Sequence, residues 1–407
     1  MTKFSLKWIW GIVFATITSS FLVTASQAAE SKTLLILNAV GDILKVDLDK
    51  GKVLGKTYIP EAYYSNRILA DPKDRYILVG GGAQLSLFLD TNSLQIKGVL
   101  KPEIPKLPWE ERSEQIYHER LSGFASVYGG EWAITPAGNK VYFSGGVSQL
   151  EPTVVIDPFT YEIKKKIDDF FIYPQTLFSP DGKFMFINHR RTHDILVIDT
   201  SSDQVIKRIQ APSEYDEFRG KLLHLDATGG LLLVTSFSPH GSGYCLVRVD
   251  TDSGKITNIM NNPFEGKRGV DAVISGGFYF VYNEYVSVPL GPNTGRRDYT
   301  GKVKIVDLRT MSRQTLSLLE RYQPENWNLA SKCYTVPAQE KILLVIKKIV
   351  DVTNPGPTYW NPKLRHRKLL QPVHLLVVDL QKAMIEKTIV LSEGGFKDCV
   401  FLPGDLR

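Results

Sequence analysis

The chain has 407 residues, of which 43% are hydrophobic and 23% are charged, and its formal net charge is +6 at pH 7. The apolar content is ample for a large buried core. Three cysteines are too few for a scaffold held together by disulfides. The mild positive charge, with no stripe of basic and aromatic residues along one element, does not indicate a nucleic-acid partner.

The first 29 residues predict a secretory signal. Lys3 and Lys7 precede an apolar stretch from Trp8 to Val23, and Ser26-Gln27-Ala28-Ala29 supplies the small residues of a cleavage site. Cleavage there would lower the formal charge from +6 to +4. The alternative is an uncleaved membrane anchor, but the apolar stretch is shorter than the roughly 20 residues that a spanning helix needs. We therefore expect a periplasmic or secreted protein with no membrane span after cleavage.

Beyond the signal, one pattern repeats seven times: a strand, a tight turn, a second strand, a variable loop, a third strand that ends in Asp, and a fourth strand. The pattern is clearest at the turn Ser179-Pro180-Asp181-Gly182, followed by the run Ile195-Leu196-Val197-Ile198-Asp199-Thr200. The terminal Asp can accept a hydrogen bond from the backbone two positions on. The seven are Asp47, Asp90, Asp157, Asp199, Asp250, Asp307 and Asp379. A period of roughly 40 to 50 residues with four strands predicts a β-propeller.

The two ends of the repeat are out of register with each other. Thr33 to Leu37 matches a second strand, whereas Asp398 to Pro403 matches a first strand. We therefore expect residues 30–407 to form a single all-β domain, a seven-bladed β-propeller closed by pairing of the N- and C-terminal strands in one composite blade. Such closure leaves no free sheet edge in the ring.

The chain's long insertions fall in one class of connection. The turns between first and second strands, and between third and fourth strands, are uniformly short. The long segments lie in the other connections, which meet at the opposite end of a propeller. They are residues 102–130, 145–152, 188–194, 211–220, 236–243, 261–269, 283–301, 320–328 and 347–372. Loops of this length in a compact fold are uncommon unless they bind something or are disordered, so we predict the functional surface there. The alternative is a face that merely tolerates insertions.

These insertions are rich in aromatic residues and arginine, which are enriched at protein interfaces. Residues 108 to 123 also read as a short helix, suited to a lid or a docking element. The residues that we expect to bind a partner are Trp109, Tyr117, Arg190, Arg191, Arg296, Arg297, Tyr359 and Trp360.

Polar residues recur five positions before the first turn of most units, where the innermost strand would enter the central channel. Two positions further on, the ring becomes apolar. We expect these polar residues to contact a ligand; the alternative is that they are solvated strand ends that pair across the ring. They are Arg67, Glu131, Gln175, Asp271, Lys332 and Asp398.

Two cysteines occupy equivalent places, because Cys333 and Cys399 each lie four residues before a turn proline in neighbouring blades. A disulfide between them would fasten the ring if their Cα atoms lie within about 7 Å; the alternative is two buried thiols. His189 and His193 have a spacing that suits a metal only on a helix, and the pattern predicts a hairpin there, so no metal site is expected.

The unit from Phe178 to Lys183, followed by Ile195 to Thr200 and Val205 to Ile209, resembles the repeat of YVTN-type propellers. That group includes the heavy chains of periplasmic amine dehydrogenases, which this chain resembles in length, export signal and blade count. A further similarity lies in Trp327 to Val345, followed by a basic loop and Leu375 to Asp379. The resemblance implies a scaffold whose quinone cofactor belongs to a separate small subunit docked on the long-loop face.

No haem, nucleophile-elbow, phosphate-loop or EF-hand signature occurs in the sequence. We therefore predict an exported, non-catalytic binding or scaffold protein that recognises a partner protein or small ligand on its long-loop face, with no cofactor and no catalytic residue of its own. One alternative is a heavy-chain-like subunit of a periplasmic amine dehydrogenase. Another is a propeller hydrolase or lactonase that uses acidic residues at the channel mouth.

Overall fold

The computed structural model describes most of the chain from Thr33 to Pro403. The described residues are 33–38, 41–60, 62, 65, 67–80, 86–100, 131–144, 153–172, 176–189, 192–210, 217–236, 244–264, 272–291, 294–322, 327–337, 339–348, 372–391 and 395–403. The predicted signal and the predicted helix at 108–123 lie outside them. Within them, no helix is long and apolar enough to cross a membrane.

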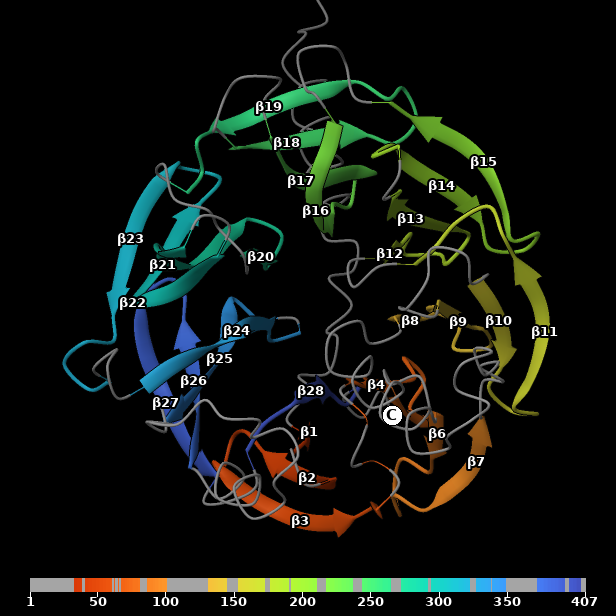
Figure 1. The fold of residues 1–407 in the computed structure, drawn as a ribbon, viewed down its shortest axis with the longest axis horizontal. Helices are drawn as coiled ribbons and strands as arrows, with labels where there is room; N and C mark the ends of the chain where they lie inside the picture. The colour runs from red at the N-terminus through yellow and green to blue at the C-terminus, as the bar shows by residue number, and fades with distance from the viewer. Residues whose placement is uncertain are drawn as a thin grey trace, which may run out of the picture.

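Seven four-stranded antiparallel sheets form a closed ring, as predicted, so the protein is a seven-bladed β-propeller (Figure 1). The first strand of each sheet lies next to the central channel and the fourth lies on the rim. From the N-terminus, the first two complete blades contain the following strands. They are β4 (Arg67–Ala70), β5 (Ile77–Gly80), β6 (Ser86–Leu89) and β7 (Ile96–Leu100), then β8 (Glu131–Ile134), β9 (Val141–Ser144), β10 (Thr153–Asp157) and β11 (Glu162–Ile167).

Four further blades have the same order. They are β12 (Leu177–Phe178), β13 (Phe184–Asn188), β14 (Ile195–Asp199) and β15 (Gln204–Ile209); β16 (Glu217–Leu225), β17 (Gly230–Ser236), β18 (Tyr244–Asp250) and β19 (Ile256–Asn261); β20 (Ala272–Ser275), β21 (Tyr279–Gly291), β22 (Thr294–Asp307) and β23 (Ser312–Ser317); and β24 (Trp327–Thr335), β25 (Lys341–Lys348), β26 (Val373–Asp379) and β27 (Met384–Leu391).

The seventh blade joins the two ends of the chain, as predicted. Its order is β28 (Asp398–Phe401), β1 (Thr33–Leu37), β2 (Asp42–Asp47) and β3 (Lys52–Tyr58). β1 and β28 run antiparallel, with Leu34 opposite Phe401 and Leu37 opposite Asp398. The Leu402 N–H donates to Thr33 O at 2.9 Å, which extends the pairing by one residue.

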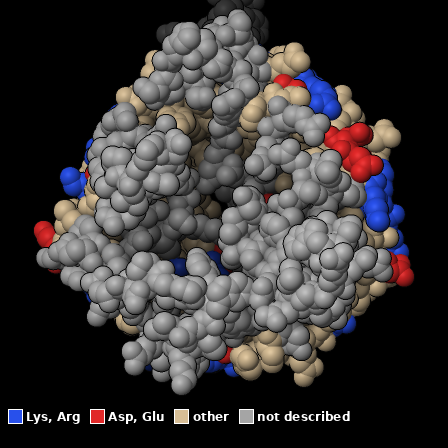
Figure 2. All heavy atoms as spheres, in the orientation of Figure 1, with Lys and Arg blue, Asp and Glu red and all other residues tan. Residues whose placement is uncertain are grey.

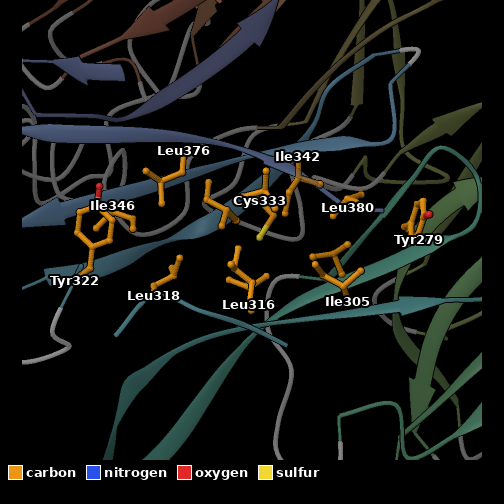
Figure 3. Packing of buried hydrophobic residues seen from close by; sticks show 14 residues of the cluster. Tyr279, Ile305, Leu316, Leu318, Tyr322, Cys333, Ile342, Ile346, Leu376 and Leu380 are labelled. Atoms are coloured by element: carbon orange, nitrogen blue, oxygen red, sulfur yellow. The ribbon is translucent and has the colours of Figure 1, made fainter. Parts of the chain in front are cut away.

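Seven hydrophobic clusters hold the ring together, one between each pair of neighbouring blades. β1 shows how the sequence builds them, because successive side chains of a strand point to opposite faces. Leu34 and Ile36 pack against the β24–β27 blade, whereas Leu35 and Leu37 pack against the β4–β7 blade. Figure 3 shows the cluster between the β20–β23 and β24–β27 blades.

The two cysteines considered as a disulfide pair lie in different clusters. Cys333 packs between the β20–β23 and β24–β27 blades, where Figure 3 labels it. Cys399 packs on the other side of the β24–β27 blade. Both are buried thiols in the structure, as is Cys245. Burial raises the pKa of the Cys245 thiol to about 11.

The short connections carry the hydrogen bonds predicted for them. In all seven blades the Asp at the end of the third strand accepts a backbone N–H two or three positions on. The Ser201 hydroxyl and the Ser202 N–H donate to Asp199, and the pKa of that carboxyl falls to about 2. The pKa of each of its six counterparts is lowered as well.

Lysines on three fourth strands connect neighbouring blades, a feature that the sequence pattern did not reveal. Lys165, Lys207 and Lys387 each lie eight residues after the turn Asp of their own blade. They donate to Ser202 O at 2.6 Å, Thr251 O at 3.0 Å and Leu48 O at 2.7 Å. Each acceptor belongs to the short turn of the next blade, so three of the fourth strands are tied to the turn of the blade that follows.

The segment 283–301 differs from its prediction as a long loop. It is a β-hairpin in which β21 and β22 stay paired from Asn283↔Val303 to Gly291↔Thr294, with register shifts after Asn283 and Pro289. The neighbouring strands end earlier: β20 pairs with β21 only over Tyr279–Tyr282. Alternating valines favour strand over loop here, and the hairpin extends beyond its blade as a two-stranded ribbon.

The turn carboxylates make stability dependent on acid pH. A carboxyl whose pKa is lower in the folded chain than in the unfolded chain stabilises the fold above its unfolded pKa of about 3.9, and the stabilisation is lost as pH falls. We expect the thermal midpoint of the wild type to fall below about pH 4. Asp199→Asn keeps an acceptor oxygen but has no carboxyl group to titrate, so the thermal midpoint of this variant should depend less on pH than that of the wild type. Thermal unfolding from pH 6 to pH 2.5 would measure the difference. Parallel curves for the two proteins would contradict the assignment.

Each of these turns also needs a residue with positive φ four positions after the Asp. The φ values at the seven positions lie between +48° and +73°, yet only Gly51 and Gly254 are glycines. Met311 has a φ of +58° and an exposed side chain. We expect Met311→Gly to stabilise the protein by about 0.5–1 kcal/mol, because a residue with a Cβ atom is strained at positive φ and glycine is not. The reverse change, Gly254→Ala, should destabilise it by a similar amount. Urea unfolding would measure both, and shifts of the same sign would contradict this explanation.

Candidate functional site

Three of the six residues predicted at the channel mouth come together. Arg67 on β4, Glu131 on β8 and Asp398 on β28 lie on three consecutive innermost strands, and their side chains interact. Looking down the ring, blue and red atoms lie deep at the centre of the molecule (Figure 2). Gln175 and Asp271 lie outside the described residues, and only the backbone of Lys332 is described.

Arg67 is the centre of this group. Its Nη2 atom donates to Glu131 Oε2 at 2.7 Å, and its Nη1 atom lies 4.0 Å from Asp398 Oδ2. The Arg67 and Glu131 side chains each retain 20% of their exposure. Burial disfavours the charge on Arg67, but Glu131 and Asp398 outweigh it, so the pKa of Arg67 is raised. The arginine therefore stays charged between its two carboxylates.

Asp398 connects this group to the strands on both sides of β28. Its side chain is only 4% exposed. It accepts a hydrogen bond from the Ile68 N–H at 3.2 Å and another from the Tyr334 hydroxyl at 2.8 Å. Burial, together with Cys399 and Asp398, raises the pKa of Tyr334 far above its ordinary value. Tyr334 belongs to β24, so the channel cluster, defined as Arg67, Glu131, Tyr334 and Asp398, spans four consecutive blades.

The sequence predicted the charged members of the cluster but not Tyr334, which was assigned to the apolar ring two positions further along. A tyrosine fits that ring with its phenyl group while its hydroxyl reaches a polar neighbour. The pairing also agrees in part with the alternative that these side chains satisfy one another across the ring. One positive and two negative charges give the four residues of the cluster a formal charge of −1.

Most of the residues predicted to bind a partner are not described. Trp109, Tyr117, Arg190, Arg191, Tyr359 and Trp360 lie outside the described residues. Arg296 and Arg297 lie on the β21–β22 ribbon, where their backbones pair with Val288 and Ser287. The ribbon projects from the long-loop end, so these two arginines belong to the predicted surface by position.

The sequence analysis did not predict an aromatic group that lies at the same end of the ring. The Tyr322 hydroxyl and His374 Nδ1 are 2.9 Å apart. The Trp327 and His374 rings have centroids 4.6 Å apart. Burial and the nearby Arg321 lower the pKa of His374. Because Tyr322 is buried in an inter-blade cluster, we assign this group to packing rather than to binding.

The histidines considered for a metal site make other contacts. His189 Nδ1 lies 2.8 Å from Thr192 Oγ1, and the Thr192 N–H donates to the same nitrogen. His193 adopts a φ of +55° in the hairpin turn. Over the described ranges, no group of three or more His, Cys, Asp or Glu side chains is arranged to hold a metal ion.

Comparison with known proteins supports the fold class. No family model matches the sequence, and no curated protein matches it either. The β-propeller domain of Myceliophteria thermophila Cps50 (Swd1) is similar, with a TM-score of 0.50 at 10% identity, over 77% of this chain and 89% of that domain. The dihydro-heme d1 dehydrogenase NirN, in complex with DHE, has a TM-score of 0.51 at 10% identity, over 92% of this chain and 75% of that one.

Hydrazine synthase of Kuenenia stuttgartiensis gives a TM-score of 0.48 at 13% identity, over 81% of this chain and 95% of that one. At such identities the similarities extend to the propeller fold alone. The resemblance to YVTN-type proteins and to amine dehydrogenase heavy chains stays a prediction.

The channel cluster predicts a graded loss of stability on mutation. Asp398→Ala removes the acceptor for the Ile68 N–H and the Tyr334 hydroxyl and leaves the partly buried Arg67 with one carboxylate. We expect a loss of about 3 kcal/mol in the free energy of unfolding. Tyr334→Phe removes one hydrogen bond and should cost about 1 kcal/mol. Urea unfolding would measure both, and equal losses would contradict the central place of Asp398.

Proposed function

We propose that this chain is an exported, non-catalytic β-propeller that binds a small ligand or a partner protein at the end of the ring where the long connections lie. The channel cluster forms the described part of the site. The observation that carries the proposal is Arg67, a partly exposed charge held between Glu131 and Asp398 on three innermost strands. A charged side chain that is already held in place in a partly buried channel can bind a polar ligand without the free-energy cost of being ordered on binding.

The opposite end of the ring supports this choice of face. Many polar groups of its turns are hydrogen-bonded within the chain. The turn aspartates accept N–H groups of their own turn, and the fourth-strand lysines donate to the turn of the next blade. Threonines after the third strand donate to the first turn of their own blade. Thr200 Oγ1 donates to Gly182 O at 2.6 Å, and Thr251 Oγ1 donates to Gly229 O at 2.8 Å. A surface whose hydrogen-bonding groups are satisfied internally has less to offer a partner.

Arg67 also bears on the hydrolase alternative. A divalent cation bound by Glu131 would lie close to the positive charge of Arg67, whose Nη2 atom donates to Glu131 Oε2 at 2.7 Å. The pairing favours binding over catalysis at this position. The amine dehydrogenase alternative has no specific support in the channel cluster.

Native mass spectrometry of the exported protein, as purified, tests the proposal. Glu131→Gln keeps a hydrogen-bond acceptor for Arg67 but brings the formal charge of the cluster to zero. We expect a ligand or partner bound to the wild type to bind at least about tenfold more weakly to this variant, a change of about 1.4 kcal/mol. Asp181→Asn, in an exposed turn at the opposite end, is the matched control and should retain the bound mass.

Equal retention by both variants would remove the channel cluster from the site. Robust turnover by the isolated chain, lost in Glu131→Gln, would replace the binding proposal with the hydrolase alternative.

A further inference from the structure

Among the residues that the structure describes, two buried polar atoms lack a hydrogen-bond partner where the β4–β7 blade meets the β8–β11 blade. They are Ser86 Oγ and Trp132 Nε1. Ser86 is 0% exposed and Trp132 is 6% exposed. Both atoms face Gly80, because a Cβ built there would lie 3.2 Å from Trp132 Nε1 and 3.4 Å from Ser86 Oγ. We call this place, bounded by Gly80, Ser86 and Trp132, the Gly80 notch.

The equivalent place in the next blade is fully hydrogen-bonded. Ser144 ends β9 and pairs with Thr153 at the start of β10, and Gly80 and Ser86 hold the corresponding places at the end of β5 and the start of β6. Ser144 Oγ and Thr153 Oγ1 are 2.7 Å apart, and Thr153 Oγ1 donates to Phe170 O at 2.5 Å. The Ile172 N–H donates to Ser144 Oγ at 2.9 Å. The β8–β11 blade thus satisfies its polar groups at this position, but not every blade does, since Oδ1 and Nδ2 of Asn283, which pairs with Val303 at the same register position, also lack a partner among the described residues.

Leaving both atoms without a hydrogen-bond partner is costly. A buried donor or acceptor without a partner costs about 1–3 kcal/mol, against a total stability of about 5–15 kcal/mol for a typical domain. The indole N–H can only donate, whereas a serine hydroxyl both donates and accepts. One oxygen atom within reach of both would satisfy them. The three atoms nearest to a Cβ built at Gly80 belong to the uncharged side chains of Trp132 and Ser86, which suit an uncharged oxygen.

The notch adjoins the channel cluster. Gly80 on β5 is the register partner of Arg67 on β4, and Trp132 directly follows Glu131 on β8. The Trp132 ring is held in place by stacking on Phe143, with centroids 4.2 Å apart. A molecule bound to Arg67 or Glu131 would therefore need to extend by only one strand to reach the notch.

We propose that the Gly80 notch binds an uncharged oxygen, which accepts a hydrogen bond from Trp132 Nε1–H and pairs with the Ser86 hydroxyl. The oxygen comes from a hydroxyl or carbonyl group of the ligand or from an ordered water molecule. The ligand source rests on the proposed function. If the oxygen belongs to the ligand, the ligand is an alcohol or a carbonyl compound. A second group of the same ligand would contact the channel cluster, which lies one strand away.

The sign of one mutational effect tests occupancy. If the notch is occupied, Ser86→Ala removes a hydrogen bond and should lower the thermal midpoint by about 2 °C or more. If it is empty, the same change removes an unsatisfied hydroxyl and should leave the midpoint unchanged or raise it, which would overturn the proposal. Ser144→Ala is the matched control, because its partners belong to the chain and its penalty is expected under all conditions.

Two preparations of each protein distinguish the sources. The proteins are measured as purified, and again after unfolding in urea, removal of small molecules and refolding. A Ser86→Ala penalty in both preparations identifies water, since water returns on refolding. A penalty confined to the purified protein identifies a ligand oxygen. Neither result depends on Glu131→Gln, so the channel-cluster proposal can fail while this one stands.

A crystal structure of the wild-type chain gives an independent measurement. Density for an isolated or ligand oxygen within hydrogen-bond distance of both Trp132 Nε1 and Ser86 Oγ would support the proposal. Protein atoms filling the notch, or a direct hydrogen bond between the two side chains, would overturn it.

Discussion

The pairing of β28 with β1 is the constraint on which the rest of the structure depends. It turns a row of seven sheets into a ring, and it brings two sequence-distant segments into one blade. Burial of a leucine or isoleucine side chain contributes about 1.5–3 kcal/mol, whereas a hydrogen bond contributes about 1 kcal/mol net. The four fully buried side chains from Leu34 to Leu37 therefore contribute more to closure than the strand pairing itself. The hydrogen bonds set the register, and the two flanking clusters supply most of the free energy.

Closure and the candidate site share a strand. Asp398 is the first residue of β28, and its carboxylate contacts β4 through the Ile68 N–H and β24 through Tyr334. The residue that accepts these bonds also helps to hold Arg67 in the channel. A ligand that draws Arg67 away from Asp398 would therefore act on the same contacts that join the composite blade to its neighbours. Binding and ring stability are linked through this one carboxylate.

The repeat pattern predicted what depends on local chemistry. An Asp at a strand end accepts nearby N–H groups in all seven turns, because that interaction needs only its own few residues. The blade count and the shared blade followed from the register of the repeat. Counting back from each turn also placed Arg67, Glu131 and Asp398 on neighbouring inner strands, since the first strands of successive blades are equivalent by rotation about the ring and bring equivalent positions to the same height.

What the pattern missed depends on packing between blades. Tyr334 bonds to Asp398 across 64 residues of sequence, and His374 meets Tyr322 across 52. The fourth-strand lysines bond to turns of the following blade, which no single repeat reveals. The segment 283–301 was misread because its length suggested a loop, although strand pairing within a hairpin is also local. Its polar and glycine residues hid the alternation of valines that favours a strand.

The two ends of the ring differ in a way that follows from these contacts. At the short-turn end, aspartates, threonines and lysines hydrogen-bond to backbone groups within and between blades. Towards the other end, Arg67 remains partly exposed and the Gly80 notch lacks partners for two buried polar atoms. Natural proteins rarely leave buried polar groups unsatisfied, and such exceptions concentrate where something else completes the structure. The sequence therefore supplies internal hydrogen-bond partners at the short-turn end. Beside the channel, at the other end, it leaves polar groups to which a ligand or an ordered water molecule can hydrogen-bond.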